Sequence, residues 1–221
     1  MTMIMKRLAM TTALITACFV TACSQPQSSE PASSTVKPPP ASQPVEDPKP
    51  EKTEDYAVFG AGCFWCVEAV LEQLKGVTSV VSGYTGGHVL NPTYDDILTK
   101  KSGHVEVAKV EFNPQIITYD ELLTWFWKLH DPTSWDKQGP DSGPQYRSVV
   151  FFHSDEQRDA AKTSMSKAQA NYESKIVTEI RKLDVFYPAE DFHQDYYPNG
   201  SHRGYINGII RPKLRKLGLK E

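Results

Sequence analysis

The sequence predicts an α+β fold of one domain, a two-layer sandwich with a mixed β-sheet and flanking helices. After residue 55, some segments alternate apolar and polar side chains, and others repeat apolar side chains every three or four positions. These segments do not follow the regular strand–helix–strand order of a doubly wound sheet. No internal repeat is visible. We therefore expect a single folded domain over residues 56–221.

The first half of this domain begins with a short strand at residues 55–62 that ends in glycines. From Cys63 the pattern becomes helical, and Gly76 ends that helix. Its apolar face consists of Val67, Val70, Leu71 and Leu74. The following segments are a strand, a loop with a short helix and a second strand, at residues 77–87, 91–104 and 104–112.

The second half begins with a helix at residues 118–130, where Thr118 and Glu121 have the spacing of a capping box. A helix capped by Ser154 is expected to run to about Tyr172. Around it lie a long loop rich in glycine and proline, a strand, a further strand and a short helix, at residues 131–145, 146–153, 175–183 and 189–197. The remainder of the chain is expected to be mostly irregular.

The first 22 residues have the features of an export signal: a basic start, a short apolar run and small residues before Cys23. The ending "VTAC" resembles the lipobox of bacterial lipoproteins, which implies a lipid on Cys23. The alternative is an ordinary signal peptide in which Cys23 is incidental. Residues 23–55 are rich in proline and poor in bulky apolar side chains, which predicts a disordered tether. We therefore expect an exported protein that is anchored by lipid to the periplasmic side of the bacterial envelope.

The formal net charge of −3 gives no basic field for nucleic acid. The stretch "GCFWCVEA" instead indicates chemistry at Cys63 and Cys66. Cys63 lies where the helix begins, and a helix N-terminus favours a thiolate, the nucleophilic form. Residues three apart on a helix can be bridged by a disulfide. The pair is therefore expected to be a dithiol that opens and closes.

Three other interpretations of the cysteine pair remain open. A structural disulfide would close a loop too small to stabilise the fold much. A zinc site needs four ligands, and the histidines offer no pair at short spacing. A thioredoxin-like oxidoreductase also has two cysteines at this spacing at the start of a helix.

Other segments add polar candidates. Glu106 shares one face of its strand with Ala108, Val110 and Phe112, and a buried carboxyl there would hold a proton and serve as a general acid. The alternative is that this end of the strand faces solvent. Tyr94 and Tyr146 flank turn-rich loops, where packing is their common role. Asp141 lies in such a loop and could simply stabilise its turn.

Five ordered motifs resemble the A-type peptide methionine sulfoxide reductases. They are "GCFWCVEA", "GYTGGHVLNPTY", "SGHVEVAKVEF", "HDPTSWDKQGPDSGPQYRS" and "FYPAEDFHQDYY". The resemblance covers nearly all of residues 56–200. It implies an α+β sandwich with a mixed sheet, reduction of the S epimer of methionine sulfoxide, and neither a metal nor an organic cofactor.

The resemblance also implies a role for each matched residue. Cys63 is the nucleophile and Glu106 is the acid. Tyr94 and Tyr146 are the hydroxyl donors, and Asp141 is a carboxylate that orders the site. Phe64 and Trp65 form the aromatic pocket for the substrate methyl group. Cys66 is expected to resolve a sulfenic acid on Cys63 as a disulfide, which an external thioredoxin-like dithiol then reduces.

Two departures from the family are visible. Many members have Gly in place of Cys66, and many have cysteines near the C-terminus, whereas this chain has none after Cys66. Pro140 and Pro144 stand where Asn and Thr are common, which puts any hydrogen bond from those backbone nitrogens in doubt.

We expect a monomer. Two alternative functions are an envelope thiol–disulfide oxidoreductase and a non-catalytic lipoprotein that binds peptides.

Overall fold

The computed structural model describes residues 55–221. The predicted signal peptide, Cys23 and nearly all of the predicted tether lie outside the described residues. Within residues 55–221, no helix combines the length and the apolar character needed to cross a membrane.

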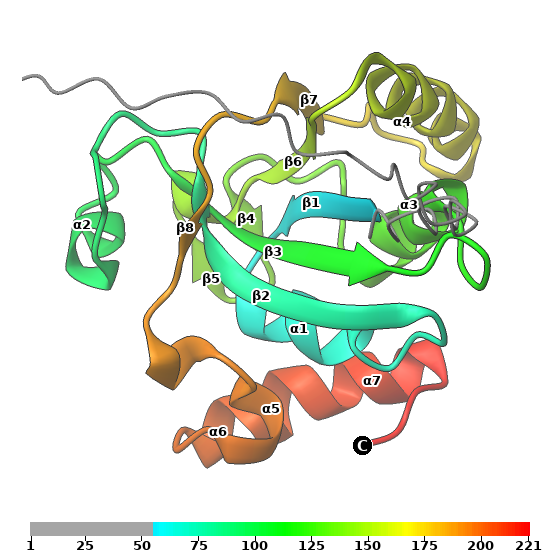
Figure 1. The fold of residues 1–221 in the computed structure, drawn as a ribbon. Helices are drawn as coiled ribbons and strands as arrows, with labels where there is room; N and C mark the ends of the chain where they lie inside the picture. Colours follow the sequence, from blue (N-terminus) through cyan, green and yellow to red (C-terminus); the bar gives the residue numbers. More distant parts are fainter. Residues whose placement is uncertain (1–54) are drawn as a thin grey trace, which may run out of the picture. The chain divides into compact units, whose positions relative to one another are not determined.

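The centre of the domain is a six-stranded mixed sheet (Figure 1). Its order is β7-β6-β1-β3-β2-β8, and only β6 and β7 pair in parallel. The strands are β1 (Asp55–Ala61), β2 (Val77–Thr85), β3 (Val105–Phe112), β6 (Ser148–Phe152), β7 (Glu179–Lys182) and β8 (Tyr187–Pro188). The loop that was predicted at residues 131–145 contains a small hairpin, β4 (Lys137–Gln138) with β5 (Asp141–Ser142).

Local sequence explains where the helices begin. Thr118 and Glu121 form the predicted capping box at the start of α3, and the Ser154 hydroxyl caps α4. Such caps stabilise a helix by about 1 kcal/mol each. The helices are α1 (Phe64–Leu71), α2 (Tyr94–Leu98), α3 (Tyr119–Leu129), α4 (Asp155–Ala168), α5 (Tyr196–Asn199), α6 (Arg203–Tyr205) and α7 (Arg211–Leu217).

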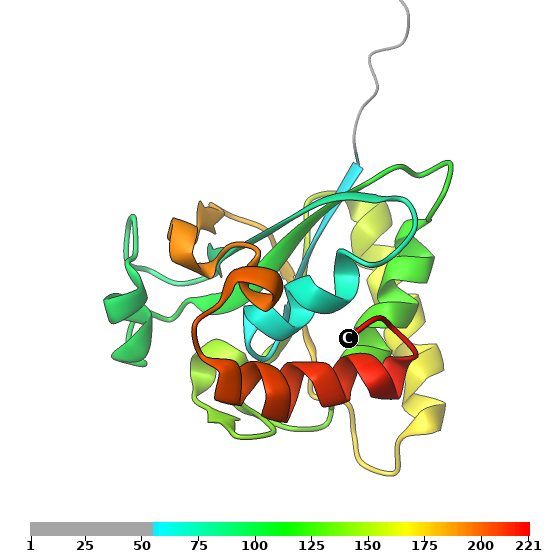
Figure 2. The same cartoon turned by 90° about the horizontal axis from the view of Figure 1, so that it is seen from below.

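Alternate side chains of the strands enter two different cores. Phe59 on β1 and Val110 on β3 contact buried side chains of α1, α3, α4 and α7. Val58 on β1 and Val107 on β3 point to the other face, where a smaller cluster includes Phe186. Since the long helices pack against one face of a mixed sheet, the predicted α+β sandwich is confirmed (Figures 1 and 2).

The prediction of irregular chain near the C-terminus is wrong. Residues 203–217 are helical throughout, because α6 continues through a π-helical segment, Ile206–Ile210, into α7. Gly204, Gly208 and Pro212 obscured this helix in the sequence, since glycine and proline disfavour helix interiors. Its buried side chains Ile206, Ile210 and Leu214 follow at intervals of four residues and pack into the same core as α1. Figure 2 shows this helix, in red, beside α1. Tertiary packing therefore outweighs the low local helix propensity.

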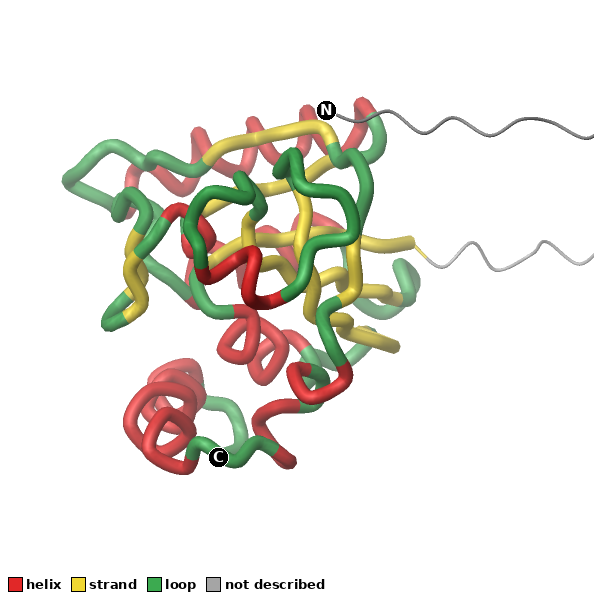
Figure 3. Tube along the Cα trace, turned by 90° about the vertical axis from the view of Figure 1, so that its left-hand side faces the viewer, coloured by secondary structure: helices red, strands yellow, loops and turns green. Residues whose placement is uncertain are grey.

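The candidate site residues lie at one end of the sheet. β1 and β2 finish there, and β3 and β6 begin there, because β1 is antiparallel to both β3 and β6 and β2 is antiparallel to β3. Helix α1 also begins at this end. Figure 3 shows that loops gather at the end of the sheet that faces the viewer.

Candidate active site

A tight turn places Cys63 at the start of α1. Gly62 has a φ of +90°, and a Cβ on it would lie 2.7 Å from the Cβ of Gln138, so both the backbone and the space require glycine. Cys63 is the N-cap residue, and its carbonyl accepts the first hydrogen bond of the helix from the Cys66 nitrogen at 3.0 Å. Both thiols are almost completely buried, with 7% and 2% exposed.

The two neighbouring thiols differ in acidity. Burial, the hydrogen bond with Cys66 and the charge of Glu106 raise the pKa of Cys63 well above its ordinary value. The hydrogen bond from Cys63 lowers the pKa of Cys66 to about 7 despite its burial, and Lys213 and the Tyr205 hydroxyl act in the same direction. The expectation of a lowered pKa for Cys63 is therefore wrong, because burial dominates over its place at a helix start.

Glu106 lies directly under the start of α1. It is on β3, where it pairs with Tyr84 of β2, and only 2% of it is exposed. Its Oε2 accepts a hydrogen bond from the Phe64 nitrogen at 3.2 Å. Burial raises the pKa of Glu106 to about 8, although the Phe64 hydrogen bond acts against this shift. The alternative of a solvated carboxyl is therefore wrong, and the group holds a proton at neutral pH.

Two phenols complete the polar part of the site. Tyr94 begins α2 and Tyr146 ends a 3₁₀ turn, and both contact the buried cluster that contains Cys63 and Phe64. Burial raises the pKa of Tyr94 to about 12 and also raises the pKa of Tyr146, and nearby Glu106 adds to both shifts. Both hydroxyls therefore remain neutral hydrogen-bond donors.

Asp141 reaches the cysteine pair through a residue that the sequence analysis missed. Its Oδ2 accepts a hydrogen bond of 2.8 Å from the Tyr205 hydroxyl, which lies 3.7 Å from the Cys66 sulfur. Asp141 is thus more than a turn residue, although it also pairs with Gln138 in the small hairpin. Tyr205 comes from the C-terminal helix, and the prediction of irregular chain there concealed it.

The proline substitutions fit the loop. Pro144 is the first residue of the 3₁₀ turn Pro144–Tyr146, a position whose backbone nitrogen needs no partner within the helix. Pro140 joins the two strands of the small hairpin. Other backbone groups close the loop, since the Gly143 nitrogen donates to the Asp136 oxygen at 2.8 Å.

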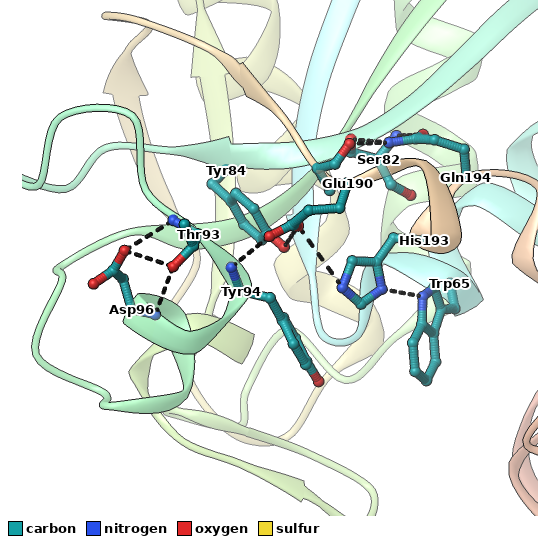
Figure 4. Close-up of polar contacts among 10 residues, drawn as sticks. Trp65, Ser82, Tyr84, Thr93, Tyr94, Asp96, Glu190, His193 and Gln194 are labelled. Carbon is teal, nitrogen blue, oxygen red and sulfur yellow. Dashed lines mark hydrogen bonds and ion pairs between the residues drawn. The ribbon is translucent and has the colours of Figure 1, made fainter.

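Trp65 is held by a chain of groups that is visible in Figure 4. Its Nε1 donates to Nδ1 of His193 at 3.1 Å, so His193 carries its proton on Nε2, which lies 3.9 Å from Glu190. The indole also stacks on the Tyr196 ring, with centroids 3.6 Å apart. The orientation of the indole is therefore fixed from two sides.

Glu190 connects this chain to the rest of the site. Its two carboxylate oxygens accept hydrogen bonds from the Tyr84 hydroxyl at 2.9 Å and the Tyr94 nitrogen at 2.7 Å (Figure 4). Glu190 and His193 both lie in the motif "FYPAEDFHQDYY". The sequence shows this motif, but it does not indicate which residues these two side chains contact. Within residues 55–221, no group of three His, Cys, Asp or Glu side chains is arranged to hold a metal ion.

The structure brings every predicted site residue of the described chain to one end of the sheet. Two thiols, a protonated carboxyl, two phenols and two aromatic rings meet there. They are Cys63, Cys66, Glu106, Tyr94, Tyr146, Phe64 and Trp65, with Asp141 linked through Tyr205. Such a site can attack an electrophilic atom and protonate a neighbouring oxygen.

Comparison with known proteins identifies the family to which this chain belongs. The family model of peptide methionine sulfoxide reductase matches residues 55–220. The chain is 45% identical over 163 residues to peptide methionine sulfoxide reductase MsrA of Saccharolobus solfataricus, which covers 74% of this chain and 92% of that protein. It is 46% identical over 164 residues to the protein of the same name from Acinetobacter baumannii, with 74% and 94% covered.

Solved structures agree with the sequence relatives. Reduced Mxr1 of Saccharomyces cerevisiae is 31% identical, with a TM-score of 0.65, and the match covers 69% of this chain and 91% of that one. Methionine sulfoxide reductase A of Corynebacterium diphtheriae is 31% identical, with a TM-score of 0.61 and with 67% and 76% covered. On the match over its whole folded part, the chain belongs to the peptide methionine sulfoxide reductase family.

Proposed function

We propose that this chain reduces the S epimer of methionine sulfoxide, free or in proteins, to methionine, with Cys63 as the nucleophile. The observation that carries the proposal is the placement of the Glu106 carboxyl. It is buried, holds a proton at neutral pH and accepts a hydrogen bond from the residue that follows Cys63. A sulfoxide offers an electrophilic sulfur to the thiol and a basic oxygen to this acid.

In the first step, the Cys63 sulfur attacks the sulfoxide sulfur and loses its proton, while Glu106 protonates the oxygen. The hydroxyl group then passes to the Cys63 sulfur as the thioether leaves, and Glu106 takes up one proton, equivalent to the one lost by Cys63, so the step has no net proton change. Two electrons move from Cys63 to the substrate. Cys63 becomes a sulfenic acid and the substrate becomes methionine.

Neighbouring groups orient the substrate in this step. The hydroxyls of Tyr94 and Tyr146 donate to the sulfoxide oxygen as its charge grows. Phe64 and Trp65 hold the methyl group by apolar contact. Because the sulfur is a stereocentre, fixed positions for the oxygen and the methyl group admit one epimer.

In the second step, Cys66 attacks the Cys63 sulfur, a disulfide forms, and water leaves. Lys213 and the Tyr205 hydroxyl both lower the pKa of Cys66, and they support this role because they favour its thiolate. The Tyr205 hydroxyl faces the Cys66 sulfur and is held in place by its hydrogen bond to Asp141. A thioredoxin-like dithiol then returns both cysteines to thiols.

The test supplies dithiothreitol and each epimer of a methionine sulfoxide peptide, and follows methionine release. We expect turnover of the S epimer alone, and none from Cys63→Ser even in a single turnover. Methionine release by that variant would place the nucleophile elsewhere. Reduction of insulin disulfides without sulfoxide turnover would indicate a thiol–disulfide oxidoreductase, and neither activity would indicate a peptide binder.

We also propose that the protein is exported and lipidated on Cys23, which the "VTAC" ending after a short apolar run supports. An anchored repair enzyme would act on oxidised proteins of the envelope. Labelling of cells with an alkyne fatty acid should tag the parent protein and leave Cys23→Ala untagged. An untagged parent protein would refute the lipid anchor.

A further inference from the structure

A groove of about 1200 Å³ runs between α3, α4 and α7. Both Cys63 and Cys66 line it, together with Asp141. The aromatic residues assigned to the substrate methyl group, Phe64 and Trp65, do not. Trp65 instead lines a separate cavity of about 460 Å³ with Tyr94 and His193. The two sulfurs can therefore be approached along a surface that the sulfoxide pocket does not use.

The walls of this groove are held by hydrogen bonds between the helices. The Trp127 indole nitrogen on α3 donates to the Ser164 hydroxyl on α4 at 2.8 Å. The Tyr172 hydroxyl donates to the Trp127 carbonyl at 2.8 Å. These bonds fix α3 against α4 and the segment that follows it. The groove is therefore a formed surface rather than a gap between loose elements.

The groove is basic. Four lysines line it, one from α3, one from α4 and two from α7: Lys128, Lys167, Lys213 and Lys216. Within residues 55–221 none of them takes part in an ion pair. The acidic side chains of the lining are Asp131 and Asp141, and both accept hydrogen bonds from hydroxyl groups. Lys128 also lies over the Trp125 ring, which gives the groove an apolar contact beside its charge.

From the two sulfurs in its lining and this unpaired positive charge, we infer that the groove is the docking surface of the protein dithiol that reduces the Cys63–Cys66 disulfide, and that this partner presents an acidic face. The inference rests on the proposed function, which leaves that disulfide to be reduced. Charges of opposite sign around a reactive pair steer encounter and select partners.

The exchange itself balances without a further reagent. One thiolate of the partner attacks a sulfur of the Cys63–Cys66 disulfide, and the other sulfur leaves as a thiolate. The second partner thiolate attacks the mixed disulfide and releases the first cysteine. The partner ends as a disulfide, having lost two electrons, and both cysteines of this chain end as thiols after taking up its two protons.

The test reverses the charge of the groove at Lys128, Lys167 and Lys216 in the full-length chain, all three to Glu. Lys213 is kept because it lies near Cys66. The matched control reverses three exposed lysines outside the groove, Lys75, Lys162 and Lys182, and so changes the net charge equally. Turnover of the sulfoxide peptide is measured with dithiothreitol, and separately with a purified thioredoxin of negative net charge, its reductase and NADPH.

We expect the groove variant to raise the KM for thioredoxin at least tenfold and to weaken its dependence on salt. The rate with dithiothreitol and the KM for the peptide should stay within about twofold of the parent, which also shows that the variant is folded. The control should match the parent in every assay. Equal thioredoxin KM values for the two variants would overturn the inference. A changed peptide KM with an unchanged thioredoxin KM would assign the groove to the oxidised substrate. If the proposed function itself is wrong, the parent will not reduce the sulfoxide peptide even with dithiothreitol, and this result is distinct from the others.

Discussion

Glu106→Gln gives the sharpest test of the chemistry. The amide keeps the shape of the side chain. It also keeps an oxygen that can accept the hydrogen bond from the Phe64 nitrogen, which is 3.2 Å long in the parent. It removes the proton that the sulfoxide oxygen receives. The fold should therefore persist while the chemical step slows.

The size of the effect follows from the burial of the carboxyl. With a pKa of about 8, about 90% of Glu106 is protonated at pH 7. At its ordinary value of 4.5 the protonated fraction would be about 0.3%. Removal of a positioned acid typically slows a reaction by about 10²- to 10⁴-fold, and we expect a loss in this range.

The pH dependence gives an independent signature. Because the acid must be protonated, the parent rate should be lost as pH rises through about 8, with about a tenfold fall for each further unit. The Glu106→Gln variant should lack this fall. Glu111→Gln is the matched control, because Glu111 is on the same strand, is partly exposed and is paired with Lys109.

The assay is a single turnover with enzyme in excess over an S-epimer sulfoxide peptide, quenched at successive times and read as methionine. Unfolding in urea confirms that the variant remains folded. A Glu106→Gln rate within about threefold of the parent, with the alkaline fall retained, would refute the reasoning and place the acid elsewhere.

Three further outcomes are expected. Cys66→Ser should keep its first turnover but lose thioredoxin-driven recycling, and mass spectrometry should find a sulfenic acid on Cys63 instead of a disulfide; recycling at the parent rate would exclude Cys66 as the resolving thiol. Tyr205→Phe should keep methionine release within about threefold and slow disulfide formation by roughly tenfold, since it loses one hydrogen bond to a carboxylate; equal rates of disulfide formation would deny the hydroxyl this role. Burial lowers the pKa of His130 to about 3 in the folded chain, so at this residue the unfolded chain binds more protons at mildly acidic pH, and the contribution of His130 to stability falls as pH falls below about 6.5. In urea unfolding, the free energy of unfolding of the parent should fall by about 2 kcal/mol relative to that of His130→Gln between pH 8 and pH 5, and parallel pH profiles would contradict the assignment.

Local patterns in the sequence were sufficient for most of the fold. Strand alternation placed Glu106 on the face of Ala108 and Val110, and the structure has it there. The capping box at Thr118 and the cap at Ser154 were correct, because capping depends on residues within one turn. The predicted cysteine pair at the start of a helix also rests on local pattern alone.

The acidity of the cysteines could not be obtained in this way. A helix start favours a thiolate, but the pKa of Cys63 is raised because burial and Glu106, which is 43 residues away in sequence, dominate. Only the packing of β3 under α1 brings that carboxyl to the thiol.

The sequence by itself determined the family, the order of the longer strands and helices up to about residue 197, and most of the candidate site residues. Tertiary structure alone decided what surrounds them. Tyr205 reaches Cys66 because Ile206, Ile210 and Leu214 gain more by burial in the core than the nearby glycines and proline lose in helix propensity. His193 fixes Trp65 across 128 residues of sequence. Such contacts depend on long-range packing, which no local spacing of side chains specifies.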